Sequence, residues 1–151
     1  MRQTLVYSFA PALSGFKLML RCSCLCRQIK FEFEDVPGQV FNCHCSVCRK
    51  SHGAAFSTQA VGKRSSLKFI QGKELLKEYH TPGGVRAFCP NCGSRLMNYA
   101  RGRSDFMSVA LSAIDSDYSG VPVAHVYVGS KADWHQPSSD IPSYDELPTA
   151  R

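Results

Sequence analysis

The sequence predicts a mainly β protein that folds as a single domain of short antiparallel strands. Its 151 residues match the usual size of one domain and suffice to bury a hydrophobic core. The hydrophobic fraction is 44% and the charged fraction is 20%, as in ordinary globular proteins. Short runs of β-branched and aromatic residues recur along the chain, separated by Gly, Pro, Ser and Asn, a pattern typical of strands joined by turns.

The first predicted strand, residues 28–34, alternates between apolar and charged side chains and places Ile29, Phe31 and Phe33 on one face. A period of two residues is that of a strand with one buried face. The remaining strands are predicted, in order, at residues 40–42, 54–61, 66–71, 75–81, 85–88, 95–100, 106–114 and 124–129.

One short helix is predicted at residues 46–52, because Gly53 follows at the position where a helix C-terminus favours glycine. The tail from Pro137 onward is expected to be extended. The apolar stretch at residues 5–20 is too interrupted by Pro, Gly and Lys to span a membrane, and it lacks a clear signal-peptide cleavage site. We therefore expect an N-terminal extension at 1–19, a folded domain at 20–151 and a cytoplasmic location.

Seven of the eight cysteines lie in three tight clusters along the chain. Cysteines one or two residues apart rarely reach disulfide geometry with each other, but they readily share a tetrahedral metal ion. A cytoplasmic protein also keeps its thiols reduced. The clusters therefore predict zinc sites whose ligands are Cys24, Cys26, Cys43, Cys45, Cys48, Cys89 and Cys92.

Two partitions of these ligands are compatible with the spacing. In the first, the four cysteines of the outer two clusters form a closed structural site, which leaves the three of the middle cluster as an open site of the catalytic kind. In the second, Cys45 and Cys48 join Cys89 and Cys92 in one zinc ribbon. The first partition is favoured on chemistry, but the spacing alone leaves both open. Cys22 is interpreted as a spare thiol. His44 is interpreted as a residue that supports the ligands from behind or lies at the surface, and not as a ligand.

The formal net charge of +6 raises the question of nucleic-acid binding. Seven thiolates bound to two zinc ions would lower this charge by about three, which leaves a mildly basic chain able to attract a small anion. Lysine and arginine do not form a dense run in the sequence. Nucleic-acid binding is therefore not expected.

Three motifs resemble the glutathione-dependent formaldehyde-activating enzyme family, which includes the centromere protein V group. They are Cys24-Leu-Cys26-Arg-Gln-Ile-Lys-Phe, Asn42-Cys-His-Cys-Ser-Val-Cys-Arg49 and Phe88-Cys-Pro-Asn-Cys-Gly-Ser-Arg-Leu96. The likeness continues through His125-Val-Tyr-Val-Gly-Ser-Lys131 and Asp133-Trp134 into the tail. Two departures are Arg27, where the family usually carries glycine, and the N-terminal extension.

The resemblance implies a zinc-ribbon-related β-tent fold and the first partition, with Cys43, Cys45 and Cys48 at the catalytic zinc. It also implies a carbon–sulfur lyase that forms or cleaves S-hydroxymethylglutathione from glutathione and formaldehyde, or a related adduct of a thiol and an aldehyde. Its partners would be these small molecules.

A zinc ion held by three thiolates is electron-rich and is a weak electrophile. The expected role of the open site is therefore to bind an incoming thiol as a nucleophilic thiolate rather than to polarise formaldehyde. Arg49 is the predicted substrate-binding residue, because a guanidinium can bind a carboxylate through two N–H groups. Arg86, Arg95, His125 and Trp134 are expected to be structural or surface residues, whereas His80 and His135 carry no signal.

Two other functions remain as alternatives. The chain could be a non-catalytic, zinc-stabilised binding module, which predicts that the second zinc is capped by a protein side chain or is permanently buried. It could also be a redox protein that uses Cys45 and Cys48, although that motif normally opens a helix in a thioredoxin-like βαβ pattern.

Overall fold

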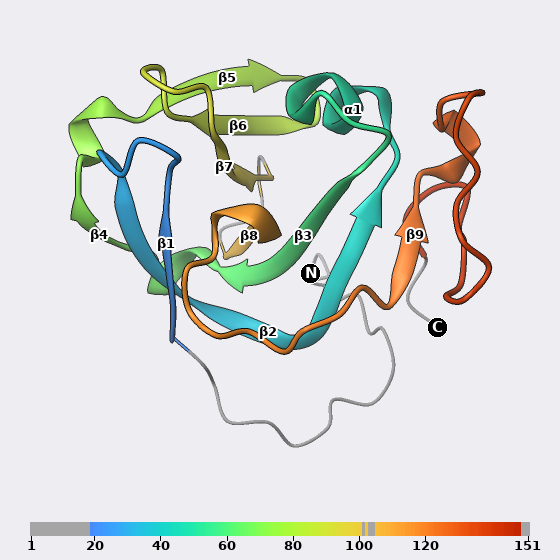
Figure 1. Cartoon of the computed structure of the whole chain (residues 1–151), viewed down its shortest axis with the longest axis horizontal. Helices are drawn as coiled ribbons and strands as arrows, with labels where there is room; N and C mark the ends of the chain where they lie inside the picture. Colours follow the sequence, from blue (N-terminus) through green and yellow to red (C-terminus); the bar gives the residue numbers. More distant parts are fainter. Residues whose placement is uncertain (1–18, 101, 103–104, 149–151) are drawn as a thin grey trace. The chain divides into compact units, whose positions relative to one another are not determined.

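The computed structural model describes residues 19–100, 102 and 105–148, and it confirms a mainly β fold (Figure 1). The chain divides into two compact units. Within the described part, the first unit contains residues 37–58 and 120–148, and the second contains residues 19–36 and 59–119. Each unit is therefore assembled from segments that are distant in sequence.

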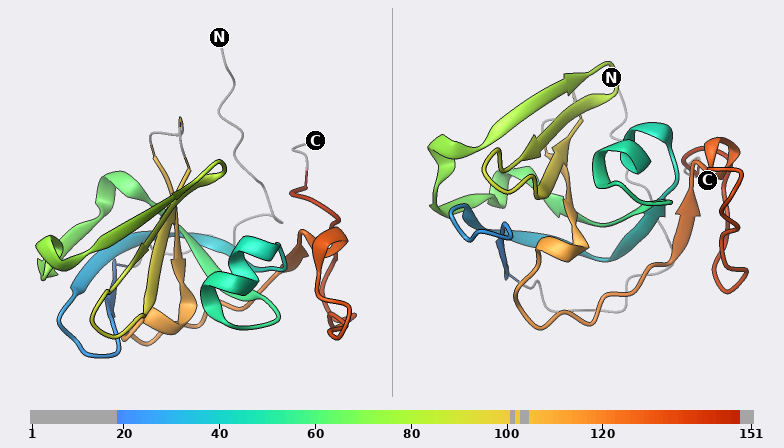
Figure 2. Two further views of the ribbon diagram at one scale, coloured as in Figure 1. Left: turned by 90° about the horizontal axis from the view of Figure 1, so that it is seen from above. Right: turned by 45° about the horizontal axis from the view of Figure 1, so that its top comes forward.

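The second unit carries most of the sheet. The strands are β1 (Met19–Ser23), β2 (Lys30–Cys43), β3 (Ser57–Lys63), β4 (Lys68–Gln71), β5 (Lys77–Thr81), β6 (Gly84–Phe88), β7 (Arg95–Tyr99) and β8 (Phe106–Ala110). They follow the order β1-β2-β3-β8-β7-β6-β5, and β4 pairs with β2 (Figures 1 and 2). Strand β2 is antiparallel to β1 and β4, β8 is antiparallel to β3 and β7, and β6 is antiparallel to β5 and β7. Short 3-10 turns lie at η1 (Arg64–Ser66), η2 (Lys73–Leu75) and η3 (Leu111–Ala113).

The buried face of β2 forms the centre of this unit. Ile29, Phe31 and Phe33 are all 0% exposed, which confirms the alternation seen in the sequence. Gly62 of β3 lies so close to Phe33 that a Cβ there would fall 2.4 Å from the ring. On the other face, Lys63 Nζ lies 2.8 Å from Glu34 Oε1. The predicted amphipathic strand therefore has one face in the core and one at the surface.

The first unit contains the C-terminal part of β2, helix α1 (Ser46–His52), strand β9 (Ala124–Val126) and the turn η4 (Val128–Ser130). Strand β9 pairs with β2 in parallel, with Cys43 opposite Val126. The helix has the predicted bounds, and Gly53 ends it with a left-handed φ of 60°. The tail adds a bridge beside β9, where Tyr144 N donates to His125 O at 2.9 Å.

Several predicted strand boundaries were wrong. The separate strands predicted at 28–34 and 40–42 are one strand, β2, which runs on through Gly38 although that residue has a φ of 73°. The strand predicted at 124–129 ends at Val126, because Tyr127 adopts a left-handed φ of 57°. The strand predicted at 54–61 begins later and ends later, at Ser57–Lys63. The strands predicted at 66–71, 75–81 and 106–114 are each shorter at one end, where 3-10 turns replace them.

Strand β1 was not predicted, and it begins at Met19, the last residue assigned to the extension. Residues 1–18 of that extension lie outside the described residues. None of the helices in the described part of the chain is long and apolar enough to cross a membrane.

Candidate metal centres

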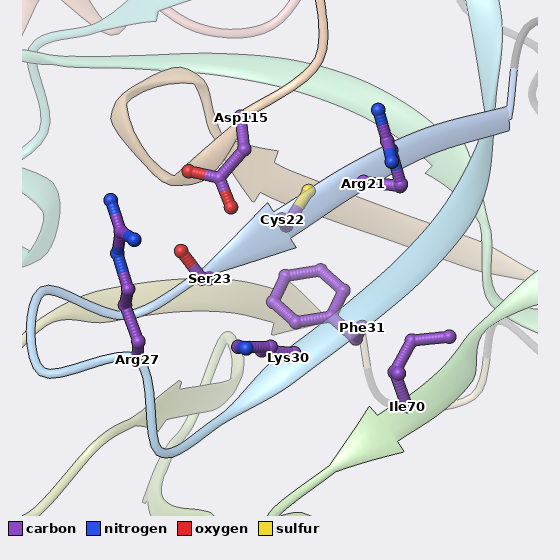
Figure 3. A pocket seen from close by; sticks show the side chains of 8 residues that line it. All are labelled: Arg21, Cys22, Ser23, Arg27, Lys30, Phe31, Ile70 and Asp115. Atoms are coloured by element: carbon purple, nitrogen blue, oxygen red, sulfur yellow. The ribbon is translucent and has the colours of Figure 1, made fainter.

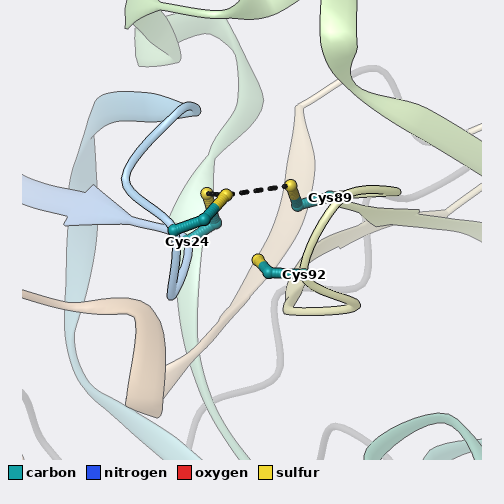
Figure 4. Close-up of side chains that lie close together, drawn as sticks. Cys24, Cys89 and Cys92 are labelled. Atoms are coloured by element: carbon teal, nitrogen blue, oxygen red, sulfur yellow. Dashed lines mark hydrogen bonds between the residues drawn. The ribbon is translucent and has the colours of Figure 1, made fainter.

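Two groups of cysteine thiols come together, one in each unit. The second unit brings together Cys24, Cys26, Cys89 and Cys92 (Figure 4), whose Sγ atoms all lie within 4.8 Å of one another. The Sγ atoms of Cys24 and Cys26 are 3.5 Å apart, and those of Cys26 and Cys89 are 3.8 Å apart. Four sulfurs placed about 2.3 Å from a tetrahedral zinc ion would lie about 3.8 Å from one another. This donor set therefore fits a closed metal site.

Two tight turns deliver these four thiols. In the first turn, Arg27 N donates a hydrogen bond to Cys24 O at 2.9 Å, and Ile29 N donates one to Cys24 Sγ at 3.3 Å. In the second, Gly93 N donates to Cys89 O at 2.8 Å, and Gly93 has a φ of 74°. Arg27 also has a positive φ, of 60°, so this turn accommodates a side chain in a conformation that glycine adopts more readily.

Ser94 links the two turns. Its hydroxyl accepts a hydrogen bond from Leu25 N at 2.9 Å and lies 3.3 Å from Cys92 Sγ. The contact with Ser94 lowers the pKa of Cys92 to about 5. A hydrogen bond from Asn91 lowers the pKa of Cys26, whereas burial raises the pKa of Cys89 to about 11. The thiols of Cys26 and Cys92 therefore lose their protons more readily than an ordinary cysteine, and metal binding requires deprotonated thiols.

The first unit brings together Cys43, Cys45 and Cys48, whose Sγ atoms also lie within 4.8 Å of one another. Cys43 ends β2, Cys45 is the N-cap of α1, and Cys48 lies in its first turn. Among the described residues, no imidazole or carboxylate completes this group. The three thiols, of which Cys43 and Cys48 are buried and Cys45 is half-buried, thus form a set of soft ligands that no described cysteine, histidine, aspartate or glutamate completes.

The three thiols compete for a single negative charge. Cys48 N donates to Cys45 Sγ at 3.3 Å, as at a helix N-cap. Hydrogen bonds from Cys43 and Cys48 lower the pKa of Cys45 to about 2, and the same hydrogen bond to Cys45 raises the pKa of Cys43. A divalent cation would relieve this conflict, because it stabilises all three sulfurs as thiolates. The donor set therefore fits a soft metal ion.

Three rings, of which His125 is buried and Phe56 and His135 are half-buried, surround His44, the residue between Cys43 and Cys45. His44 is 0% exposed, so of the two positions expected for it, at the surface or behind the ligands, the buried one is correct. Its Nε2 lies 2.9 Å from His125 Nδ1, its ring stacks on His135 at 5.5 Å, and Phe56 lies 5.0 Å away. Burial lowers the pKa of His44 to about 4, so its imidazole is neutral at physiological pH. Sequence reasoning missed His135, because no motif marks it.

Arg49 fixes the same segment from the helix side. Its Nε donates to His44 O at 3.2 Å, and its Nη2 donates to Ser130 O at 3.1 Å. The guanidinium therefore joins the loop between the ligands to η4 in the same unit. A substrate contact by Arg49 stays a prediction.

The other residues named from the sequence lie outside both clusters. The Arg95 guanidinium lies 5.4 Å from the centroid of the Phe88 ring, and His80 lies 3.7 Å from Glu78 at the surface. His125 is buried, whereas Trp134 is 75% exposed. Cys22 is 2% exposed and belongs to neither group. All eight cysteines are free thiols, which agrees with the choice of metal over disulfides.

Fold and site together define a mainly β protein with two cysteine clusters suited to soft metal ions, one of four thiols and one of three. The family model described as glutathione-dependent formaldehyde-activating enzyme matches residues 19–130. The chain belongs to this family.

Two known proteins are similar to it. A protein from Halomonas elongata, provisionally named as a glutathione-dependent formaldehyde-activating enzyme, is 30% identical over 126 residues, which cover 78% of this chain and 80% of the relative. A crystal structure of a Rhodobacter sphaeroides protein superimposes with a TM-score of 0.57 at 22% identity, covering 66% of this chain and 92% of that protein. The second likeness shows a shared fold.

Proposed function

We propose that Cys43, Cys45 and Cys48 form the active centre of a carbon–sulfur lyase that joins glutathione to formaldehyde, or cleaves the resulting S-hydroxymethylglutathione. The observation that carries this proposal is the group of three converging thiols, which no fourth cysteine, histidine or carboxylate completes among the described residues. Three protein ligands and one open position are the pattern of catalytic zinc sites. Family membership supplies the substrate pair.

In this proposal the four-cysteine cluster holds a structural zinc ion, and the three-cysteine cluster holds a second, catalytic one. A zinc ion at the second site would lower the pKa of an incoming thiol and keep its sulfur nucleophilic at neutral pH. The chain's part is to fix the three thiols before the substrate arrives. The N-cap position of Cys45, the buried ring of His44 and the carbonyl contacts of Arg49 all serve this purpose.

The reaction needs no oxidant or reductant. The sulfur of the thiol forms a bond to the carbonyl carbon, the thiol proton is released, and the carbonyl oxygen takes up a proton to become a hydroxyl. Cleavage is the reverse. The protein accelerates the addition by holding the sulfur deprotonated and close to the aldehyde.

Arg49 is the proposed contact for a carboxylate of glutathione. A guanidinium carries five N–H donors, and the two carbonyl contacts of Arg49 engage its Nε and one of its Nη atoms. These contacts hold the side chain beside the helix that carries Cys48, so its position needs no ordering when the substrate binds. Because the proposed chemistry requires reduced thiols, we also propose that the protein acts in the cytoplasm.

The experiment is an exchange measurement, since the uncatalysed addition of thiols to formaldehyde is already facile. The zinc-loaded protein is added to an equilibrium mixture of glutathione and carbon-13 formaldehyde, and the rate of exchange between free and bound formaldehyde is read by NMR. We expect acceleration by the wild type and its loss, by more than about tenfold, in Cys48→Ser. Cys22→Ser is the matched control and should keep the full rate. No acceleration by the wild type would instead support the zinc-stabilised binding module.

A further inference from the structure

A cavity of about 470 Å³ lies in the second unit, next to the turn that carries Cys24 and Cys26. Its lining includes three cationic side chains, one carboxylate and an apolar patch (Figure 3), supplied by Arg21, Arg27, Lys30, Asp115, Phe31 and Ile70. Figure 3 shows Arg27, Lys30 and Asp115 arranged around Ser23. The volume falls in the range of small-molecule sites, which is about 300–1,000 Å³. The four-cysteine cluster and the three-cysteine centre contribute no ligand to its lining.

The charge balance of the cavity favours an anion. Arg21, Arg27 and Lys30 together carry three positive charges, and Asp115 carries one negative charge. Cations gathered in a concave site raise the local concentration of small anions. Three cations around one hollow can also share two acidic groups, and the exposed, apolar Ile70 can contact a short carbon chain between them.

The backbone of Arg27 has a conformation that is unfavourable for a residue with a side chain. Its φ of 60° lies in the left-handed region, which an L residue with a Cβ adopts less readily than glycine. Two contacts hold this conformation: Arg27 N donates to Cys24 O at 2.9 Å, and Gln71 Nε2 donates to Arg27 O at 3.3 Å. A glycine would satisfy both backbone contacts without the cost. Backbone strain of this kind concentrates at ligand clamps and functional sites.

The walls of the cavity are tied together by backbone contacts. Arg21 N donates to Ser116 Oγ at 2.8 Å, and Asp115 N donates to Arg21 O at 2.8 Å. Lys30 pairs with Ser23 at the end of the β1–β2 ladder. The backbones of Arg21, Lys30 and Asp115 are therefore held on one framework before any ligand binds.

From the cavity, its charges and the strained Arg27, we infer that this site binds a small organic dianion of the dicarboxylate class. The site is separate from the three-cysteine centre and does not depend on the proposed function.

The test uses the full-length, zinc-loaded chain and succinate as the probe, with acetate as the monoanion for comparison. Binding is measured by NMR titration, with the amide signals of Cys22, Lys30 and Ile70 as reporters. Arg27→Gly removes the charge and relieves the strained backbone, so it should fold with equal or higher thermal stability and bind succinate about tenfold more weakly. Asp115→Ala should bind succinate more tightly, since it removes the opposing charge.

Lys77→Gln is the matched control, because it removes one exposed positive charge on β5, outside the cavity. The proposal stands if succinate binds more tightly than acetate, if Arg27→Gly weakens it, and if Lys77→Gln does not. It is overturned if succinate does not shift the reporter signals, or if Arg27→Gly and Lys77→Gln weaken binding equally. Cys48→Ser should leave succinate binding unchanged, which separates this result from the fate of the proposed enzyme activity.

Discussion

His44 Nε2 lies 2.9 Å from His125 Nδ1, and both residues are buried. His44 stands between Cys43 and Cys45, and His125 belongs to β9, which pairs with the end of β2. One imidazole must donate and the other accept, so the pair satisfies a buried nitrogen on each ring. This contact fixes the three-cysteine segment to the strand beside it.

Replacing His125 tests that contact. His125→Ala leaves His44 Nε2 buried without its partner, which should lower the free energy of unfolding by about 1–3 kcal/mol. The measurement is equilibrium denaturant unfolding of the zinc-loaded chain. His80→Ala, the same change at an exposed site, should stay within about 0.5 kcal/mol of the wild type. Equal effects of the two variants would show that the His44–His125 contact contributes nothing.

The packing of the first cysteine turn against the end of β4 gives a second prediction. A Cβ at Gly72 would fall 2.1 Å from Gln28 O, and Gly72 also has a φ of 72°. Gly38 has nearly the same φ, 73°, but a Cβ at Gly38 would meet nothing within 4 Å. Gly38→Ala should therefore cost about 1 kcal/mol from backbone strain alone. Gly72→Ala should cost at least about 2 kcal/mol more, because the backbone of the turn must move.

Thermal unfolding of the two glycine variants measures this difference directly. If Gly72→Ala and Gly38→Ala melt together, the close approach of Gly72 to Gln28 does not constrain the turn that carries Cys24 and Cys26.

Removal of metal should destabilise the fold through the four-cysteine cluster. Structural zinc contributes its binding free energy to folding, so a strong chelator should lower the melting temperature of the wild type by more than about 10 °C. Cys92→Ser should melt low from the start and respond less to the chelator. A wild type that keeps its melting temperature after zinc is shown to be gone would contradict a structural role.

Cys22 provides the internal control for the metal ligands. Burial raises the pKa of Cys22 to about 12, so at pH 8 it is almost entirely a neutral thiol, which is a poor metal ligand and nucleophile. Cys22→Ala should therefore keep the wild-type zinc content, whereas Cys24→Ala should lose about one ion. In the folded wild type at pH 8, mass spectrometry should find Cys22 unmodified by iodoacetamide. Loss of zinc in Cys22→Ala would mean that the run from Cys22 to Cys26 binds metal differently.

The fold class and the presence of metal-ligating cysteines could be predicted from the sequence, because alternation along strands and tight cysteine spacing are local patterns. Alternation gave the buried face of β2, and Gly53 marked the end of α1 correctly. The cysteine spacing was compatible with two partitions, and the structure groups the thiols as the first partition does. Strand ends were less predictable, because left-handed residues such as Tyr127 stop a strand without a glycine to mark the place.

The surroundings of the three-cysteine cluster could not be predicted from the sequence. His135 meets His44 only after the tail folds back over β9, and the sequence separation of these residues hides the contact. The cavity around Arg27 could not be predicted for the same reason. Asp115, which lines the cavity, is distant in sequence from Arg27 and is held there by the hydrogen bond from its backbone N to Arg21 O. Long-range packing, and not residue type, decides these features.

The most direct test of the central claim is the zinc content per chain of the wild type and of Cys48→Ser, each with and without glutathione. An exchangeable three-cysteine site beside a closed four-cysteine site predicts about two ions in the wild type and about one in the variant, with glutathione perturbing the metal only in the wild type. One ion in both proteins, indifferent to glutathione, would contradict the two-site account and leave a zinc-stabilised module whose function lies elsewhere.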